Sequence, residues 1–233
     1  MLIKVCGLRD PENIRAVIGL GVDFIGFVFQ PDDPRFVQMI SSRAGIIPDY
    51  SEERLHRIKD DATQGEEGPN VGVRRVGVFA DDMPQSIVTR VYNYSLDYVQ
   101  LNGQELPVMI DNLRRTLSPD IRPGIMIIKT LRICQREDFA VWKDYQGHAD
   151  MLLFDIQPSS DNLNVVHHDW SILDAYDGDI PFLLGGTISL DDADSLKTIK
   201  HPMFVGVDLD TCFEIQPAVK DIDMLNKFIN TIR

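Results

Sequence analysis

Polar side chains stand at the ends of several short apolar runs in this sequence. Cys6 closes the run LIKVC directly before Gly7, and Asp155 closes the run MLLFD. A thiol whose pKa is lowered by amides or a cation can act as nucleophile or general base. A carboxylic acid in a partly apolar site has a raised pKa and can donate a proton. The alternatives are a small buried hydrophobe for Cys6 and a loop cap for Asp155. Together the two residues are a candidate base and acid pair.

Two further features suit a ligand that carries anionic groups. Arg35, in QPDDPRFV, has a rigid guanidinium fork that matches a carboxylate, and the alternative is a surface ion pair with Asp32 or Asp33. Gly185 and Gly186 follow the run FLL, and glycines there would let backbone amides approach a phosphate. A tight turn explains the two glycines equally well.

No metal centre is expected from the histidines and cysteines. His167 and His168 are adjacent, so their side chains point in different directions, and no third ligand has suitable spacing. The three cysteines, Cys6, Cys134 and Cys212, are widely spaced, which argues against a disulfide framework or a zinc site.

The composition excludes several classes of partner. The net charge of -13 disfavours nonspecific binding to nucleic acid or an anionic membrane. No signal peptide precedes the first expected strand, and no apolar run reaches the ~18 residues of a membrane span. We therefore expect a reducing, cytoplasmic setting.

The elements that must position these residues alternate along the chain. Apolar or β-branched runs predict strands at 2–6, 23–29, 74–80, 96–102, 124–133, 148–155, 181–186 and 203–209. Helical spacing follows each run, at 11–21, 51–59, 83–93, 106–117, 136–145, from 169, at 189–199 and at 219–232. Strands flanked by helices at every repeat predict a buried parallel sheet.

Eight such units without a break in composition predict an α/β protein. They favour a single (β/α)₈ barrel over 1–233 rather than an open doubly wound sheet. The Gly-rich and acidic stretch at 62–72 is then a surface insertion rather than a domain linker. Because barrel active sites lie at the carboxyl ends of the strands, the last residue of each run is a candidate. These strand ends are Cys6, Phe29, Asn102, Lys129, Asp155, Gly185, Gly186 and Asp208.

The ordered motifs resemble the phosphoribosylanthranilate isomerase family of tryptophan biosynthesis. The resemblance begins at IKVCGLRDPENI, continues through GVDFIGFVF, DPRFV, RVGVFAD, LDYVQLNGQE and IIKTLRI, and ends with ADMLLFD, PFLLGGTI and VGVDLDTCFE. It implies a barrel enzyme that catalyses the Amadori rearrangement of N-(5-phosphoribosyl)anthranilate to 1-(2-carboxyphenylamino)-1-deoxyribulose 5-phosphate, without metal or organic cofactor.

The resemblance also implies roles for individual residues. Cys6 would be the general base that takes the proton from C2 of the sugar, and Asp155 the general acid that protonates the ring oxygen. Arg35 would hold the anthranilate carboxylate. The remaining substrate contacts would come from Gly7, Asn102 and Lys129. The phosphate would lie on backbone amides around Gly185, Gly186, Asp210 and Thr211.

The sequence departs from the family pattern at three places. The Gly-rich loop after the sixth strand is replaced by IQPSSDNLNVVHHDW, which has no glycine. Asn102 stands where the family has histidine, which removes a titratable group but keeps hydrogen-bonding capacity. Asp210 lies near the expected phosphate and would repel it unless its side chain points away.

These departures leave more than one function open. The first is an active isomerase with a changed loop. The second is a paralogue without isomerase activity that binds a phosphorylated ligand or acts as a regulatory module, and a third is an isomerase for another sugar phosphate. The sequence leaves the assembly state open, and a monomer is compatible with it.

Overall fold

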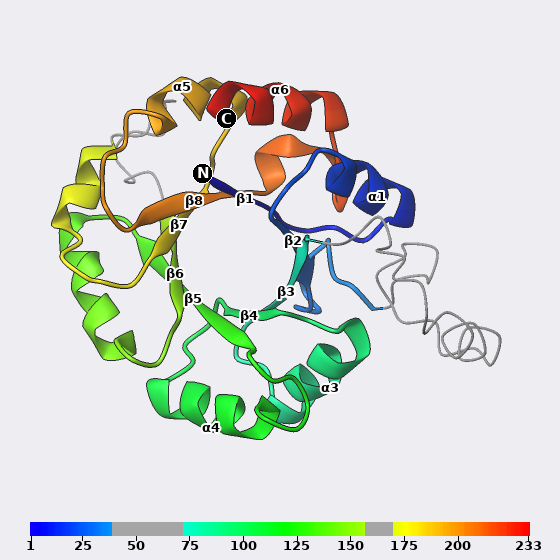
Figure 1. Cartoon of the computed structure of the whole chain (residues 1–233), viewed down its shortest axis with the longest axis vertical. Helices are drawn as coiled ribbons and strands as arrows, with labels where there is room; N and C mark the ends of the chain where they lie inside the picture. The colour runs from blue at the N-terminus through cyan, green and yellow to red at the C-terminus, as the bar shows by residue number, and fades with distance from the viewer. Residues whose placement is uncertain (39–71, 157–169) are drawn as a thin grey trace, which may run out of the picture.

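Eight parallel strands close into a barrel in chain order (Figure 1). The computed structural model describes residues 1–38, 72–156 and 170–233. The strands are β1 Leu2–Val5, β2 Phe24–Val28, β3 Arg74–Phe79, β4 Tyr98–Leu101, β5 Met126–Ile133, β6 Met151–Ile156, β7 Phe182–Gly186 and β8 Phe204–Leu209. The barrel closes because β1 pairs with both β2 and β8, so that Lys4 lies opposite Phe24 on one side and Asp208 on the other. The predicted (β/α)₈ barrel is confirmed.

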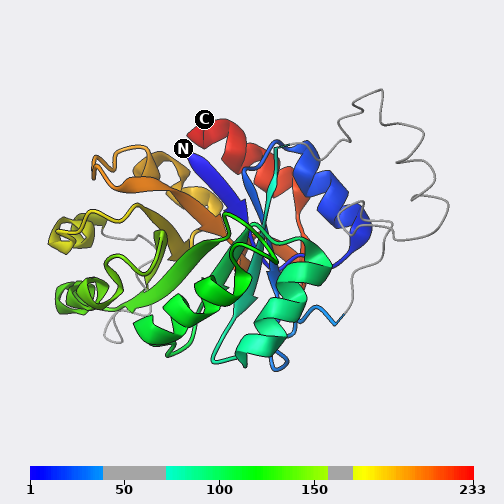
Figure 2. The same cartoon turned by 60° about the horizontal axis from the view of Figure 1, so that its bottom comes forward.

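Helices and helical turns surround the strands (Figures 1 and 2). The α-helices are α1 Pro11–Gly19, α3 Pro84–Tyr94, α4 Pro107–Leu117, α5 Ala193–Leu196 and α6 Ile222–Ile232. The 3₁₀ segments are η2 Arg136–Tyr145, η3 Trp170–Ala175, η4 Leu190–Asp192 and η5 Thr211–Phe213. The start of α1 follows from its sequence, because the Asp10 carboxylate accepts from the N–H groups of Glu12 and Asn13 and Pro11 needs no partner there.

Alternate residues of each strand face two different cores. Residues such as Phe24, Val76 and Ile128 fill the barrel interior. Their neighbours, such as Ile25 and Ile127, pack in the larger core between the strands and the helices. This alternation decides which strand side chains can reach a site inside the barrel mouth.

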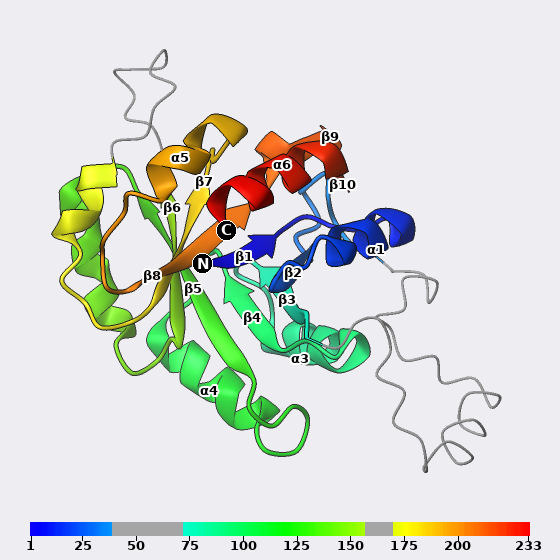
Figure 3. The same ribbon diagram turned by 45° about the horizontal axis from the view of Figure 1, so that its top comes forward.

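A short hairpin fastens the segment after β8 to the start of the chain. β9 Glu214–Gln216 pairs with β10 Val219–Lys220, and the hairpin lies near α1 and α6 (Figure 3). The Asn13 amide donates to the Lys220 carbonyl and accepts from its N–H, both at 2.9 Å. The hairpin thereby holds the loop that carries Asp210 and Thr211.

The structure differs from the predicted elements in the second half of the chain. The segments predicted as helices at 136–145 and after 169 are 3₁₀ segments, and the one at 189–199 is a 3₁₀ turn followed by a single α-turn. The last helix begins at Ile222 rather than Val219, because the hairpin occupies the preceding residues. The predicted helix at 51–59 and all of the 62–72 insertion except Gly72 lie outside the described residues. Within the described parts of the chain, no helix has the length and apolar character that crossing a bilayer requires.

Candidate active site

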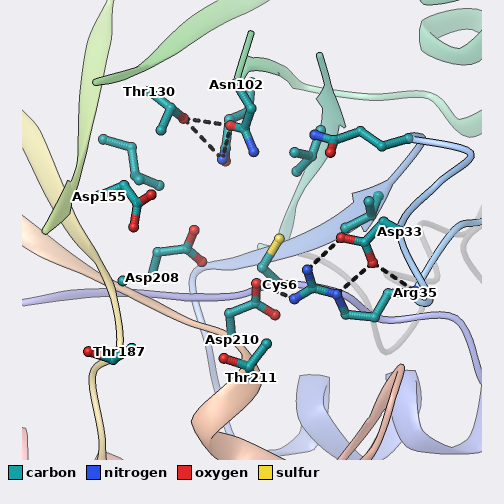
Figure 4. Close-up of a pocket in the computed structure, with 16 residues that line it drawn as sticks. Cys6, Asp33, Arg35, Asn102, Thr130, Asp155, Thr187, Asp208, Asp210 and Thr211 are labelled. Carbon is teal, nitrogen blue, oxygen red and sulfur yellow. Dashed lines mark hydrogen bonds and ion pairs between the residues drawn. The ribbon is translucent and has the colours of Figure 1, made fainter. Parts of the chain in front are cut away.

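A cavity of about 290 Å³ opens among the carboxyl ends of the strands (Figure 4). This is the face where barrels of this type hold their active sites. Residues predicted from the sequence that line it are Cys6, Arg35, Asn102, Asp155, Gly186, Asp208, Asp210 and Thr211. A second hollow of about 490 Å³ adjoins the cavity and shares Gln30, Asn102, Thr130 and Asp155 with it. The predicted residues Gly7, Gly185 and Lys129 stand outside the cavity lining.

Cys6 follows β1 directly and faces the barrel interior. Its N–H donates to the Leu209 carbonyl at 2.9 Å. A Cβ on Gly26 would lie 2.8 Å from the Cys6 Sγ, so glycine at that position makes room for the thiol. Cys6 is 4% exposed. Burial raises the pKa of its thiol to about 12 although Lys4 attracts the thiolate. Near neutral pH, Cys6 in this environment is a protonated thiol.

A buried ion pair between Lys4 of β1 and Asp208 of β8 faces the barrel interior beside Cys6. The Lys4 Nζ lies 2.7 Å from the Asp208 Oδ2, and the Lys4 side chain is fully buried. Burial alone would lower the pKa of Lys4, but Asp208 together with Cys6 and Asp210 outweighs it, and the pKa is raised. Burial raises the pKa of Asp208. The sequence held a signal for Lys4, since a residue two positions before Cys6 on a strand shares its face.

Arg35 is held between carboxylates of two loops. Its Nε and Nη2 donate to the two oxygens of Asp33 at 2.8 and 2.6 Å. Its Nη1 pairs with Asp210. Arg35 holds the pKa of Asp33 below its ordinary value against the opposing effect of burial. The pKa of Asp210 is also lowered against burial, by Lys220 and Arg35 together. The ion pair with Asp33 that the sequence left open is present, and Asp210 adds a second one.

Asp210 has a second cationic partner on the hairpin. The Lys220 Nζ lies 3.1 Å from the Asp210 Oδ1 and 2.9 Å from the Glu214 Oε1. Lys220 is the larger of the two cationic influences that lower the pKa of Asp210, ahead of Arg35. Sequence reasoning missed Lys220, because its link to the cavity depends on the hairpin.

Gly7 closes the wall behind the guanidinium. Its φ is +77°, a conformation that favours glycine. A Cβ at Gly7 would meet the Arg35 Cδ at 2.8 Å and the Asp210 Oδ1 at 3.1 Å. Glycine at this position therefore lets Arg35 and Asp210 approach the end of β1.

Asp155 faces the cavity from the end of β6, beside the glycines of β7. Its side chain is 23% exposed, and the Arg132 Nε lies 3.9 Å from its Oδ2. Gly185 lies opposite Asp155 in the strand register. Gly186 has φ +103°, and a Cβ there would lie 2.4 Å from the Ile156 carbonyl oxygen. Gly186 therefore has to be glycine for the turn, while its exposed face lines the cavity.

Asn102 belongs to a polar group on the far wall of the cavity (Figure 4). Its Oδ1 accepts from the Gln100 Nε2 at 2.9 Å and from the Thr130 Oγ1 at 2.6 Å. This leaves the Asn102 Nδ2 group to donate hydrogen bonds. The alternation of β4 and β5 places Gln100 and Thr130 on the inward face, a signal that the sequence analysis did not use.

Lys129 lies in the middle of β5 and not at its end, so its prediction as a strand-end residue is wrong. It neighbours the inward-facing Ile128 and therefore points to the outer core. Its Nζ lies 2.9 Å from the Glu105 Oε2 and donates to the carbonyls of Leu101 and Gly103 at 3.1 and 2.7 Å. With all three donors engaged, Lys129 holds the loop after β4 and contacts only the adjoining hollow.

The described parts of the chain contain no cluster of three His, Cys, Asp or Glu side chains that could hold a metal ion. His167, His168 and the changed loop before them lie outside the described residues. What the cavity offers is proton transfer: a thiol and a carboxyl group face one space beside a guanidinium. These groups suit acid–base chemistry on a small anionic molecule.

The sequence matches a known protein family over nearly its whole length. Residues 3–231 match the family model described as N-(5'phosphoribosyl)anthranilate (PRA) isomerase. The N-(5'-phosphoribosyl)anthranilate isomerases of Parabacteroides distasonis and Phocaeicola vulgatus are 36% and 34% identical, each over 100% of this chain and over 93% and 98% of their own lengths.

A solved structure of phosphoribosyl anthranilate isomerase in complex with reduced 1-(o-carboxyphenylamino)-1-deoxyribulose 5-phosphate has the same fold. Its TM-score is 0.70 at 23% identity, over 100% of this chain and 98% of the other. The full-length match to the family model and the identity to these two relatives therefore show that this chain belongs to the phosphoribosylanthranilate isomerase family.

Proposed function

We propose that this protein is the phosphoribosylanthranilate isomerase of tryptophan biosynthesis, working without a cofactor in the cytoplasm. It would convert N-(5-phosphoribosyl)anthranilate to 1-(2-carboxyphenylamino)-1-deoxyribulose 5-phosphate. The observation that carries the proposal is the placement of Cys6 and Asp155, which line one cavity from different strands of the barrel. Family membership supports the same reaction.

The first step is assigned to Asp155 as the general acid. Its proton goes to the ring oxygen of the ribose, the bond from that oxygen to C1 breaks, and the nitrogen lone pair forms a C1=N iminium. Asp155 is a partly exposed carboxyl group at the cavity wall, where it can reach a bound ligand.

The second step is assigned to Cys6 as the general base. Its thiolate takes the proton from C2, and the electrons of that bond form the C1=C2 enamine and neutralise the nitrogen. Because burial raises the pKa of Cys6 to about 12, a neighbouring positive charge is needed to form the thiolate. The iminium supplies that charge, and the thiol proton leaves to solvent as the thiolate forms, so ring opening by Asp155 precedes the loss of the C2 proton.

Substrate binding is assigned to the groups around the two reacting residues. Arg35 would take the carboxylate of the anthranilate ring with the donor capacity that Asp33 and Asp210 leave free. Gly7 would give the ring space, and Asn102 would donate from its amide. The phosphate would lie on backbone amides around Gly185, Gly186, Asp210 and Thr211, while the ion pairs of Asp210 turn its charge toward Arg35 and Lys220.

A second candidate is a family paralogue that binds a phosphorylated ligand without isomerising it, or acts as a regulatory module. Two observations favour it. The thiol of Cys6 is strongly protonated, and Arg35 already has two carboxylate partners. Such a protein would bind the substrate or product but leave it unchanged.

The test follows the loss of anthranilate fluorescence with freshly generated phosphoribosylanthranilate. The wild-type protein is compared with Cys6→Ala and Asp155→Asn, and with Cys134→Ala as a matched control at an exposed cysteine outside the cavity lining. The isomerase proposal expects activity in the wild type and in Cys134→Ala and a loss of about 10²-fold or more in the other two variants. Equal rates in all four proteins, or no turnover at high enzyme concentration, would reject it.

A further inference from the structure

We propose that Asp208 is a further catalytic residue, whose free carboxylate oxygen binds the hydroxyl group on C2 of the substrate and accepts its proton when the ketone forms. This inference rests on the proposed isomerase function. It concerns a carboxylate that neither of the two assigned proton transfers uses.

Asp208 is placed as a substrate contact rather than as a purely structural partner. It is 6% exposed, yet it lines the cavity, and Figure 4 shows its carboxylate directed into that space. One oxygen, Oδ2, accepts from the Lys4 Nζ at 2.7 Å. The other, Oδ1, is buried and has no hydrogen-bond partner among the described residues. A buried carboxylate oxygen without a partner is costly, so an O–H donor from a ligand would satisfy it.

The neighbours of Asp208 place it beside the reacting carbon. Asp208 lies opposite Lys4 in the pairing of β1 with β8, and Cys6, directly after β1, is the next residue on the same face. On the other side, Asp208 borders Gly185 of β7, where a Cβ would approach the Leu153 Cδ2 to 3.0 Å and the Asp208 Cβ to 3.7 Å. Asp208 and Asp155 line the same cavity. A carbon whose proton goes to Cys6 would carry its hydroxyl toward the same wall.

The charge of Asp208 selects the kind of group that it can bind. A carboxylate repels a phosphate or a second carboxylate, so the anionic ends of the substrate must lie elsewhere. A hydroxyl donates to it in a charge-assisted hydrogen bond. The fully buried Lys4 keeps the carboxylate in place and balances its charge.

The reaction also requires an acceptor at this position. After Cys6 has taken the C2 proton, the enamine carries a hydroxyl on C2. The ketone forms when C1 takes up a proton from solvent and the oxygen on C2 loses its own. The C1=C2 electrons form the new C1–H bond, and the electrons of the broken O–H bond form the C2=O double bond. Asp208 Oδ1 would receive the oxygen-bound proton and later release it to solvent. Burial raises the pKa of this carboxyl group, which favours its transient protonation.

The experiment measures the affinity of the reduced product, which carries a hydroxyl on C2, and of its 2-deoxy and 3-deoxy analogues by titration calorimetry. The proteins are the wild type, Asp208→Asn, and the double variant Lys4→Met/Asp208→Leu. The double variant replaces the buried ion pair with apolar side chains. It should therefore stay folded, and its affinity can be measured, even if Asp208→Asn unfolds. Near-UV circular dichroism establishes that each protein is folded.

The wild type is expected to bind the reduced product about 10-fold or more tightly than the 2-deoxy analogue. This preference should fall to less than about 3-fold in the double variant, while the loss on removing the 3-hydroxyl should be the same in both proteins. An equal preference for the 2-hydroxyl in both proteins would overturn the inference, as would an Asp208 dependence of the 3-hydroxyl alone. If the wild type isomerises the substrate but either of these two contradicting outcomes is observed, only the role of Asp208 is wrong. If the wild type neither turns over the substrate nor binds the reduced product, the proposed function fails and the inference with it.

Discussion

The titration of Cys6 tests the electrostatics of the cavity most directly. Burial moves the pKa of this thiol from an ordinary 9.0 to about 12. At about 1.4 kcal/mol per pKa unit, this shift is a differential free energy of about 4 kcal/mol between thiol and thiolate. At pH 8 only about one molecule in 10⁴ would then carry the thiolate, against about one in ten for an ordinary thiol of the same starting value.

The assay is alkylation of Cys6 by iodoacetamide between pH 7 and 11 in a Cys134→Ser/Cys212→Ser background. The rate should rise about tenfold with each pH unit and show no plateau below about pH 11, because only the thiolate reacts. The pH dependence separates the pKa from steric access, since poor access lowers the rate equally at every pH. The urea-unfolded protein is the control, whose rate should reach half its maximum near pH 9 and level off above about pH 10.

A midpoint near pH 9 with a plateau from about pH 10 in the folded protein would refute the reasoning, since it would show a thiol that burial does not perturb. The same shift predicts the direction of a stability change. Because the folded pKa lies above the unfolded one, the contribution of Cys6 is complete below about pH 9 and is lost as the pH rises toward 12. Cys6→Ala should remove this alkaline loss.

Two further substitutions test the ion pairs around the barrel mouth. Lys129→Met leaves the Glu105 carboxylate buried without its cation, so urea unfolding should show a loss of about 3 to 5 kcal/mol, against less than about 0.5 kcal/mol for Arg132→Met at an exposed position of the same strand. A small loss in Lys129→Met would contradict the structural role given to this lysine. Asp210→Asn removes a charged partner from both Lys220 and Arg35 and should cost about 2 kcal/mol at pH 7. Because the pKa of Asp210 is lowered in the fold, this difference should be present above about pH 4 and disappear as the pH falls further. A difference that persists at pH 2 would contradict it.

The strands were more predictable than the helical segments between them. Each strand of the closed barrel corresponds to an apolar run, because strands buried on both faces have to be apolar over most of their length. The helices with proline at their first position were also found close to their observed starts. The segments at 136–145 and 189–199 have helical spacing but form 3₁₀ turns or a single α-turn. Over so few residues the two kinds of helix have nearly the same pattern.

Part of the candidate site was present in the sequence alone. Cys6, Asp155 and Gly186 end their strands as polar residues or glycine, and the closed barrel brings strand ends to one face whatever their distance in the chain. The motifs around them resemble one family throughout the chain, which agrees with the family that the comparisons show. The sequence by itself therefore determined the fold, the family and the face that holds the cavity.

Only the tertiary structure decided how the charged side chains are used. Lys4 and Lys129 both lie within apolar strands, but the alternation of the strand turns Lys4 into the barrel and Lys129 to the outer core. Arg35 and Asp210 come from loops far apart in the sequence and form an ion pair because β1 closes the barrel against β8. The state of Cys6 depends on burial and on charges from several strands. Ion pairs and pKa values depend on all the charges that lie near a group in space, and the linear sequence does not state which charges will be neighbours.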